Sequence, residues 1–339
     1  MKILYGIQGT GHGHVSRARE IIPKLLRLAD VDVLMSGYNC KLSIDGVQVD
    51  KKRGVSLTYD SNGGISFLKT VLQIQPVRFL QDVNSIEIDT YSAIISDYEP
   101  VTAWAARTGG LPSISLSHQA SFLSDKSPRP EKKSLLAEKI LKHFAPCNKP
   151  IGFHFQRYDR FILPPIIRHD VRQLDVKNGS HVTVYLPAFD HETLTSMFLQ
   201  CKQAEWHLFS PLCDAPYQKD NVFVHPVGNK PFLESLAHAK GVITSAGFET
   251  CAEAMYLGKK LLVVPIKNQY EQLCNAAALQ QMGVDVVKSI DGTFSTTIEN
   301  WLRESSPVQL PEIADTDMLA KDIVRFAHLY NRKKNLLFG

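Results

Sequence analysis

The chain has 339 residues, of which 44% are hydrophobic and 21% charged, so its composition excludes a disordered chain and its length allows two folded domains. The net charge is +4, but the basic residues are not interleaved with aromatic ones, so the sequence gives no support for nucleic-acid binding. No apolar run reaches the ~20 residues of a membrane span. The six cysteines form no Cys-x-x-Cys pair and residues 1–6 lack the features of a signal peptide, so we expect free thiols, no metal site and a cytoplasmic protein.

Strand-like and helix-like runs alternate along residues 1–165, as in a parallel, doubly wound sheet. The expected strands are residues 3–7, 31–35, 93–96 and 113–116, with one or two short strands within 47–59. The expected helices are residues 16–28, 65–83 with an interruption near Pro76, 101–108 and 133–143.

The same alternation restarts at residue 181, after a polar stretch, residues 166–180, that we interpret as a linker. The expected strands are residues 181–186, 206–209, 222–224, 241–244 and 260–264. The expected helices are residues 191–203, 232–238, one that begins at Gly247, and 318–330. We therefore predict an α/β protein with two Rossmann-like domains, residues 1–165 and 181–317, that face each other across a cleft. Residues 318–339 are expected to form a C-terminal helix and basic tail that packs back on the first domain.

A glycine-rich loop, residues 9–14, follows the first strand and contains His12 and His14. Glycines let the backbone approach a ligand closely, and histidine is a suitable general base near neutral pH. The glycines alternate by two, which departs from the Gly-x-Gly-x-x-Gly spacing of dinucleotide-binding loops, and a His-x-His metal pair would lack further ligands. A cap at the start of the following helix is the alternative role for His14.

Asp97 directly follows the strand expected at residues 93–96. It would therefore lie at the carboxyl edge of the sheet, where parallel sheets form their sites and a carboxylate can orient a histidine base. The alternative is that Asp97 caps the next helix. Glu99 and His118 fall at the ends of neighbouring strands and are candidates to line the same site.

The most informative segment is residues 242–276, where a buried strand ends and a helix begins at Gly247. A helix N-terminus carries unpaired N–H groups and a partial positive charge, which suits a phosphate. Thr250 and Glu253 lie on one face of that helix and could offer a hydroxyl and a carboxylate to the same ligand. The loop after the next strand is expected to present Glu271 and Gln272.

The ordered series Gly247, Thr250, Glu253, Glu271, Gln272 and Asn275 resembles the donor-binding segment of the inverting GT-B glycosyltransferases. That superfamily includes the lipid-linked N-acetylglucosaminyl transferase of peptidoglycan synthesis and the plant-type nucleotide-sugar transferases. Residues 9–17 resemble their N-terminal Gly-His-Val loop, and residues 94–100 resemble a signature of a bacterial branch. The layout is similar over nearly the whole chain, but residues 186–189 lack the Gly-Ser turn common in plant-type enzymes.

The resemblance implies a metal-independent, inverting hexosyltransferase that moves a sugar from a nucleotide-diphospho-sugar, expected to be a UDP-sugar, to an acceptor hydroxyl without a cofactor. It implies His14 as the catalytic base, Asp97 as its partner, the C-terminal domain as the donor domain and the N-terminal domain as the acceptor domain. The implied donor-binding residues are Gly247, Phe248, Thr250, Glu253, Glu271, Gln272 and Asn275, with the base of the donor against residues 227–232. The implied acceptor-binding residues are Gly11, Gly13, Glu99 and His118. Ser245 stands where a retaining enzyme carries a glutamate, eight residues before Glu253, and this favours inversion.

Residues 124–149 hold seven Lys or Arg against three Asp or Glu, a local excess of four that equals the net charge of the chain. This basic segment suggests attraction to phosphate groups or to an anionic membrane surface, and the alternative is an ordinary solvated loop and helix face. Together with the helix expected at residues 65–83, it points to an acceptor at the membrane face. We therefore expect a lipid-linked acceptor of a cell-envelope glycan and a peripheral location at the inner face of the membrane, with a soluble sugar or small molecule as the alternative acceptor.

Two other functions remain open. A nucleotide-sugar 2-epimerase would share the two-domain fold, but such enzymes lack the Glu-Gln pair found here at Glu271 and Gln272. A non-catalytic nucleotide-sugar-binding subunit would not need His14 and Asp97, which are both present.

Overall fold

The computed structural model describes residues 1–10, 12–37, 47–55 and 75–338. The strands of the N-terminal lobe are β1 (Lys2–Gln8), β2 (Asp30–Ser36), β3 (Val49–Lys52), β4 (Ala93–Asp97), β5 (Ser113–Ser117), β6 (Lys149–Phe153) and β7 (Ile162–Leu163). Its helices are α1 (His12–Leu26), α3 (Pro76–Asn84), α4 (Pro100–Gly109) and α5 (Leu135–His143), with short 3-10 helices η1 (Ile88–Thr90) and η2 (Gln119–Leu123). Helix α6 (His169–Arg172) lies in the segment between the lobes.

The strands of the C-terminal lobe are β8 (His181–Tyr185), β9 (Glu205–Ser210), β10 (Tyr217–Lys219), β11 (Val222–Pro226), β12 (Gly241–Thr244), β13 (Lys260–Val263) and β14 (Asp285–Val286). Its helices are α7 (His191–Phe198), α8 (Asn229–His238), α9 (Phe248–Tyr256), α10 (Tyr270–Gln281) and α11 (Phe294–Glu304). The long helix α12 (Thr316–Phe338) ends the described chain.

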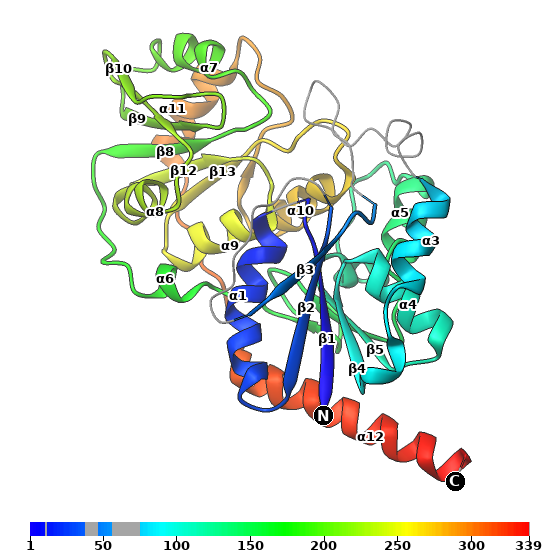
Figure 1. Ribbon diagram of the computed structural model, residues 1–339. Helices are drawn as coiled ribbons and strands as arrows, with labels where there is room; N and C mark the ends of the chain where they lie inside the picture. The colour runs from blue at the N-terminus through cyan, green and yellow to red at the C-terminus, as the bar shows by residue number, and fades with distance from the viewer. Residues whose placement is uncertain (11, 38–46, 56–74, 339) are drawn as a thin grey trace.

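The described strands form two sheets, one in each lobe (Figure 1). Their orders are β3-β2-β1-β4-β5-β6-β7 and β10-β11-β9-β8-β12-β13-β14, and the neighbouring strands are parallel except for β10 and β11. The central strands read as continuous apolar runs because helices cover both faces of such sheets; every residue of β12 is buried. The predicted α/β fold with two doubly wound domains is confirmed.

Several boundaries differ from the sequence prediction. Residues 270–281 form helix α10, so Glu271 and Gln272 lie in its first turn and not in a loop. Strand β6 and helix α11 were not expected, because β6 is short and begins with Lys-Pro, and α11 has polar residues over most of its surface. Only the last part of the helix expected at residues 65–83 is described: α3 begins at Pro76, where proline is well tolerated because its missing N–H would be unpaired anyway. Residues 65–74 lie outside the described chain.

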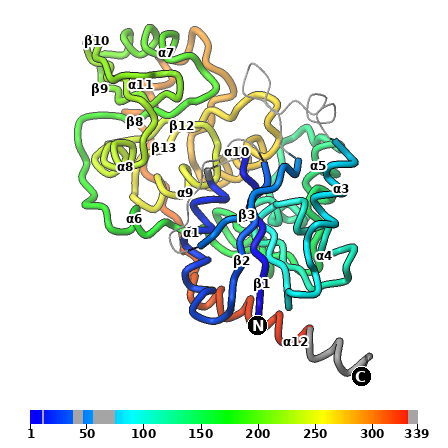
Figure 2. The backbone as a smooth tube through the Cα atoms, in the orientation of Figure 1, coloured from blue at the N-terminus to red at the C-terminus, as the bar shows by residue number. Residues whose placement is uncertain are grey.

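Helix α12 belongs spatially to the N-terminal lobe although it follows the C-terminal lobe in the chain. Figure 2 shows it running beneath the N-terminal lobe beside α1. Asp317 at its start pairs with Lys24 at 2.7 Å and Arg27 at 2.6 Å, and Leu319 and Ile323 join the buried cluster formed with α1. The C-terminal helix therefore ties the two ends of the chain together.

Candidate functional site

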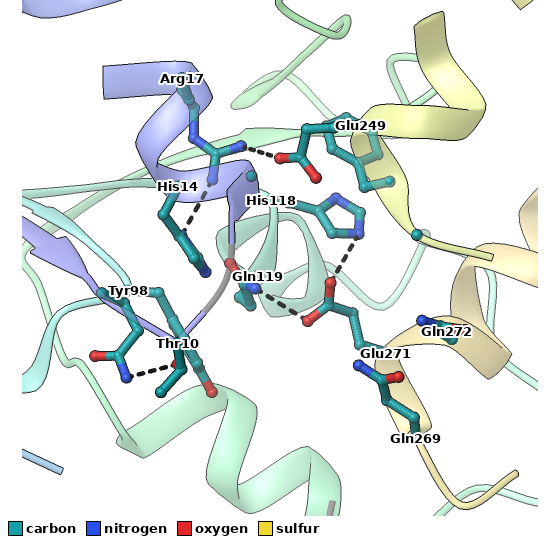
Figure 3. A pocket seen from close by; sticks show the side chains of 14 residues that line it. Thr10, His14, Arg17, Tyr98, His118, Gln119, Glu249, Gln269, Glu271 and Gln272 are labelled. Carbon is teal, nitrogen blue, oxygen red and sulfur yellow. Dashed lines mark hydrogen bonds and ion pairs between the residues drawn. The ribbon is translucent and has the colours of Figure 1, made fainter. Parts of the chain in front are cut away.

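The carboxyl edges of both sheets contribute to one pocket (Figure 3). The N-terminal lobe supplies Gln8, Thr10, Gly13, His14, Arg17, Tyr98, His118 and Gln119. The C-terminal lobe supplies Gly247, Phe248, Glu249, Gln269, Glu271 and Gln272. The pocket thus brings together residues from five separate stretches of the chain, as expected for a ligand site at the edge of parallel sheets.

His14 and Asp97 form a hydrogen-bonded pair at this pocket. Strands β1 and β4 are neighbours, with Ile7 beside Asp97, so the first turn of α1 lies directly against the end of β4. His14 Nδ1 lies 2.7 Å from Asp97 Oδ1, and the Asp97 carboxylate is fully buried. When Nδ1 donates to Asp97, the second ring nitrogen of a neutral imidazole is left as a proton acceptor, which is the arrangement of an oriented general base.

Arg17 completes this pair, and the sequence analysis did not single it out. Its Nε donates to Asp97 Oδ2 at 2.8 Å and its Nη2 donates to Asp97 Oδ1 at 2.9 Å. Burial opposes ionisation of Asp97, but Arg17 and His14 outweigh it, so the pKa of this carboxyl lies below its usual value. The signal was available, because Arg17 lies three residues after His14 and so on the same face of a helix.

Tyr98 and Glu99 turn the chain immediately after Asp97. Tyr98 has a φ of 53°, in the left-handed region that non-glycine residues rarely adopt, and its side chain lines the pocket. Glu99 points inward and accepts hydrogen bonds from the backbone N–H groups of Val101 and Thr102, each at 2.7 Å. The cap of α4 is therefore Glu99 and not Asp97. Glu99 is fully buried, so the expectation that it contacts an acceptor is corrected: this side chain does not line the pocket.

His118 lines the pocket and also joins the two lobes. Its ring stacks on Phe248 of α9 with the centroids 4.0 Å apart, and its Nδ1 lies 2.7 Å from the carbonyl oxygen of Phe153. Its Nε2 lies 2.8 Å from Asn275 Oδ1, while Asn275 Nδ2 donates to the carbonyl of Ala246. Both ring nitrogens thus lie within hydrogen-bond distance of oxygens, and together with the stacking on Phe248 these contacts fix the ring between the two lobes.

Asn275 is fully buried, and it holds the turn before α9 from behind, outside the lining of the pocket. The start of α9 is open on the pocket side. Gly247 is the N-cap residue, no side chain caps the helix, and a methyl group added at Gly247 would meet no atom within 4 Å. The first N–H groups of the helix therefore have space for an anion. Thr250 lies half-buried in the first turn, and Phe248 is buried with its ring at the pocket.

Glu253 lies one turn further along α9, held by Arg168 from the segment between the lobes. Arg168 donates to its two carboxylate oxygens at 2.6 and 2.7 Å, and Glu253 is only 3% exposed. Burial raises the pKa of Glu253, and Arg168 offsets part of that effect. Arg168 also donates to Asn229, which lines a second cavity together with Val227 and Phe232. The sequence analysis missed Arg168, whose pairing depends on the path of the linker.

Glu271 and Gln272 enter the same pocket from α10. Glu271 Oε2 accepts a hydrogen bond from Gln119 at 3.0 Å, and Gln272 Oε1 accepts one from the backbone N–H of Ile266 at 2.9 Å. Gly13 lies opposite α9, and a methyl group there would come within 2.6 Å of both oxygens of Glu249. A side chain at position 13 would therefore displace the Glu249 carboxylate from its present place. Gly11 lies outside the described residues.

Within the described residues, no group of three or more His, Cys, Asp or Glu side chains is arranged to hold a metal ion. None of the described helices combines the length and the apolar character needed to cross a membrane.

Comparison with known proteins identifies a family and a fold. Residues 1–304 match the sequence model of Glycosyl transferase family 1, whereas a search of curated proteins found no match. Arabidopsis thaliana UGT89C1, complexed with UDP, superposes with a TM-score of 0.65 at 13% identity, over 96% of this chain and 99% of that chain. Streptomyces sp. SF2575 SsfS6, complexed with thymidine diphosphate, gives 0.62 at 15% identity over 97% and 99%. Acinetobacter baumannii MurG gives 0.54 at 13% identity over 96% and 99%. At such identities these structures show a shared GT-B fold.

Proposed function

Because the chain belongs to Glycosyl transferase family 1 and is a glycosyltransferase of the GT-B fold, we propose that it transfers a hexosyl group from a UDP-sugar to an acceptor hydroxyl, with inversion and without a metal. The observation that carries this proposal is the His14–Asp97 pair, which lies in one pocket with the uncapped start of α9. The solved structures of UGT89C1 with UDP and with UDP-L-rhamnose support a uridine nucleotide as the donor.

The donor half of the reaction is assigned to α9. The diphosphate would lie at the helix start near Gly247, with the Thr250 hydroxyl as a further contact. As the bond between the anomeric carbon and the phosphate oxygen breaks, its electron pair goes to the departing diphosphate. The N–H groups and dipole of the helix stabilise that charge electrostatically.

The acceptor half is assigned to His14. The acceptor oxygen forms its new bond to the anomeric carbon on the face opposite the leaving group, and its proton passes to the free ring nitrogen of His14. The buried Asp97 carboxylate stabilises the resulting imidazolium. General-base assistance of this kind contributes about 10²- to 10⁴-fold to the rate. Ser245, where retaining enzymes carry glutamate, favours a single displacement.

The remaining donor contacts follow the same assignment. Glu253, held in place by Arg168, would accept hydrogen bonds from the ribose hydroxyls. The base would occupy the neighbouring cavity lined by Val227 and Phe232. Glu271 and Gln272 would hold the sugar from α10.

We assign the acceptor to the lipid-linked class, presented at an anionic membrane surface. Leu135 and Leu136 on α5 are 78% and 58% exposed, and the exposed Lys132, Lys133 and Lys139 lie beside them in the chain. Exposed leucines among lysines suit an interface between acyl chains and anionic headgroups. Part of the basic segment has another role, because Arg129 is nearly buried and pairs with Glu138 at 2.5 Å.

The donor assignment is tested by screening UDP-, dTDP- and GDP-sugars for protection against thermal unfolding, since a ligand that binds only the folded state raises Tm. The UDP-sugars are expected to give the largest shift, and protection by another nucleotide class alone would contradict the choice of donor. Incubation of the protected donor without acceptor then separates a transferase from an epimerase, which would convert the donor to its epimer.

The membrane assignment is tested by sedimentation with phosphatidylglycerol and with phosphatidylcholine vesicles. The protein is expected to sediment with the anionic vesicles, and Leu135→Glu with Leu136→Glu should abolish this. Leu212→Glu, which changes an equally exposed leucine of the C-terminal lobe, serves as the matched control. Sedimentation that is the same for both lipids, or that survives the double substitution, would favour the soluble acceptor.

A further inference from the structure

The guanidinium of Arg17 contacts both halves of the site. Two of its nitrogens bind Asp97, the partner of the base, and Nη1 donates to Glu249 Oε1 at 3.1 Å. Arg17 itself is 4% exposed, and its guanidinium lies over the ring of Phe153 with 5.4 Å to the centroid. A buried cation with three directed contacts is held in one position.

Glu249, which Arg17 contacts on the C-terminal side, lies close to the proposed diphosphate site. Glu249 is the second residue of α9, so its carboxylate lies beside the helix start where the diphosphate would bind. It lies against Gly13, where even a methyl group would collide with it. An uncompensated carboxylate in that place would repel an anionic donor, and Arg17 supplies the compensating charge.

The His14–Asp97 pair, which Arg17 contacts on the N-terminal side, also requires its positive charge. The Nη2 of Arg17 lies 3.3 Å from His14 Nδ1, and Asp97 is fully buried. Among the described residues, Tyr5 of β1 also faces this cluster. Burial and Asp97 raise the pKa of Tyr5 well above its usual value, so it stays neutral. Without Arg17, Asp97 would face His14 as its single cationic partner, and the pair would hold a proton more tightly. A base that already holds a proton cannot accept one from the acceptor.

We infer that Arg17 is a positioning residue that serves both substrates: it keeps the His14–Asp97 pair ready to accept a proton, and it neutralises Glu249 beside the diphosphate seat. The inference rests on the proposed transferase function for its first part. Its second part concerns nucleotide binding alone and can be measured without turnover.

The experiment compares Arg17→Gln, Glu249→Gln and the double variant by UDP titration calorimetry and by pH profiles of kcat/KM, after circular dichroism has shown that each is folded. Arg17→Gln is expected to weaken UDP binding about tenfold because Glu249 is left uncompensated. It should also move the acidic limb of the pH profile of kcat/KM upward by about one pH unit, so that activity partly returns at alkaline pH.

The double variant separates the two roles. It should bind UDP within about threefold of the unsubstituted protein, while the acidic limb of its pH profile stays displaced. If Arg17→Gln lowers activity equally at every pH and leaves UDP affinity unchanged, the inference is wrong and Arg17 is only structural. If the double variant binds UDP as weakly as Arg17→Gln does, the role assigned to Glu249 is wrong.

Glu249→Gln keeps the inference testable if Arg17→Gln does not fold, because Glu249 is 30% exposed and its replacement leaves Asp97 paired. Glu249→Gln alone should tighten UDP binding about threefold, since Arg17 is then free of its second anion. Unchanged or weaker binding would contradict the inference. If UDP binding changes as expected but the protein transfers no sugar, the proposed transferase function is wrong, and the role of Arg17 in neutralising Glu249 is still supported.

Discussion

The proposed base in the N-terminal lobe and the proposed diphosphate seat in the C-terminal lobe face the same pocket, but side chains form the first and backbone forms the second. His14, Asp97 and Arg17 are linked by hydrogen bonds of 2.7 to 2.9 Å around a fully buried carboxylate. The start of α9, in contrast, has no side-chain cap and open space before Gly247. We infer from this comparison that the proposed catalysis depends on the identity of a few side chains, whereas the proposed donor binding depends on the position of a helix end.

The largest effect is expected when the proposed base, which is formed by side chains, is removed. His14→Ala should lower kcat by about 10²- to 10⁴-fold, because the proton acceptor is lost, and should leave UDP affinity nearly unchanged. Transfer of labelled sugar and UDP calorimetry measure the two effects separately. His328→Ala, which changes an exposed histidine of α12, is the control and should retain full activity. If His14→Ala loses UDP binding as well, His14 is a structural residue.

The backbone half should respond in the opposite way. At Gly247, φ is −69° and the surrounding space is open, so Gly247→Ala should leave the Tm of the free protein unchanged and weaken UDP binding about tenfold by filling the seat. Gly258 provides the contrast, because its φ of +66° disfavours any side chain. Gly258→Ala should cost about 1 kcal/mol of unfolding free energy while UDP affinity stays the same. Equal behaviour of the two variants would contradict the account of the seat.

A smaller effect is expected from Asn275, which supports the backbone half from behind. Asn275→Ala leaves the Ala246 carbonyl and His118 without their buried partner, so it should lower the free energy of unfolding by about 1–3 kcal/mol. Urea denaturation measures this loss, and Gln281→Ala on the exposed end of α10 is the control. If Asn275→Ala is as stable as the control, the turn before α9 does not depend on Asn275.

The smallest effect concerns pH and distinguishes the lobes again. Burial, with His181 and His225 nearby, lowers the pKa of His207 in β9 to about 4. The pKa of Asp97 in β4 is also lowered, but it starts from the much lower ordinary value of a carboxyl group. A histidine that stays neutral when folded destabilises the fold as pH falls from about 6.5 toward 4, because the unfolded chain binds the proton first. The stability that a depressed carboxyl provides is lost only at lower pH. Hydrogen exchange at pH 5 should therefore show β9 losing protection before β4, and the reverse order would contradict this assignment.

The sequence predicted the parts of the site that depend on local order. The carboxyl ends of parallel strands converge, so His14 and Asp97 could be placed together, and a strand that ends at a glycine before a helix predicted the seat at Gly247. The same reasoning wrongly placed Glu99 in the site. It stands at the same strand end, and only the turn at Tyr98 shows that its side chain points inward to cap α4.

The contacts between the lobes could not be predicted. Arg17 and Glu249 are 232 residues apart, and Arg168 reaches Glu253 from the linker. Both pairs depend on how two independently wound sheets face each other, which no local periodicity encodes. The role of His118 likewise changed, because its stacking on Phe248 arises only when the lobes meet.

The stereochemistry of the product tests the central claim most directly, namely that one base in the N-terminal lobe and one diphosphate seat in the C-terminal lobe support a single displacement. The measurement is proton NMR of the anomeric centre formed from an α-configured UDP-sugar and a competent acceptor. A β-linked product is predicted. An α-linked product would require a double displacement or a front-side mechanism, and would contradict the roles assigned to His14 and Asp97.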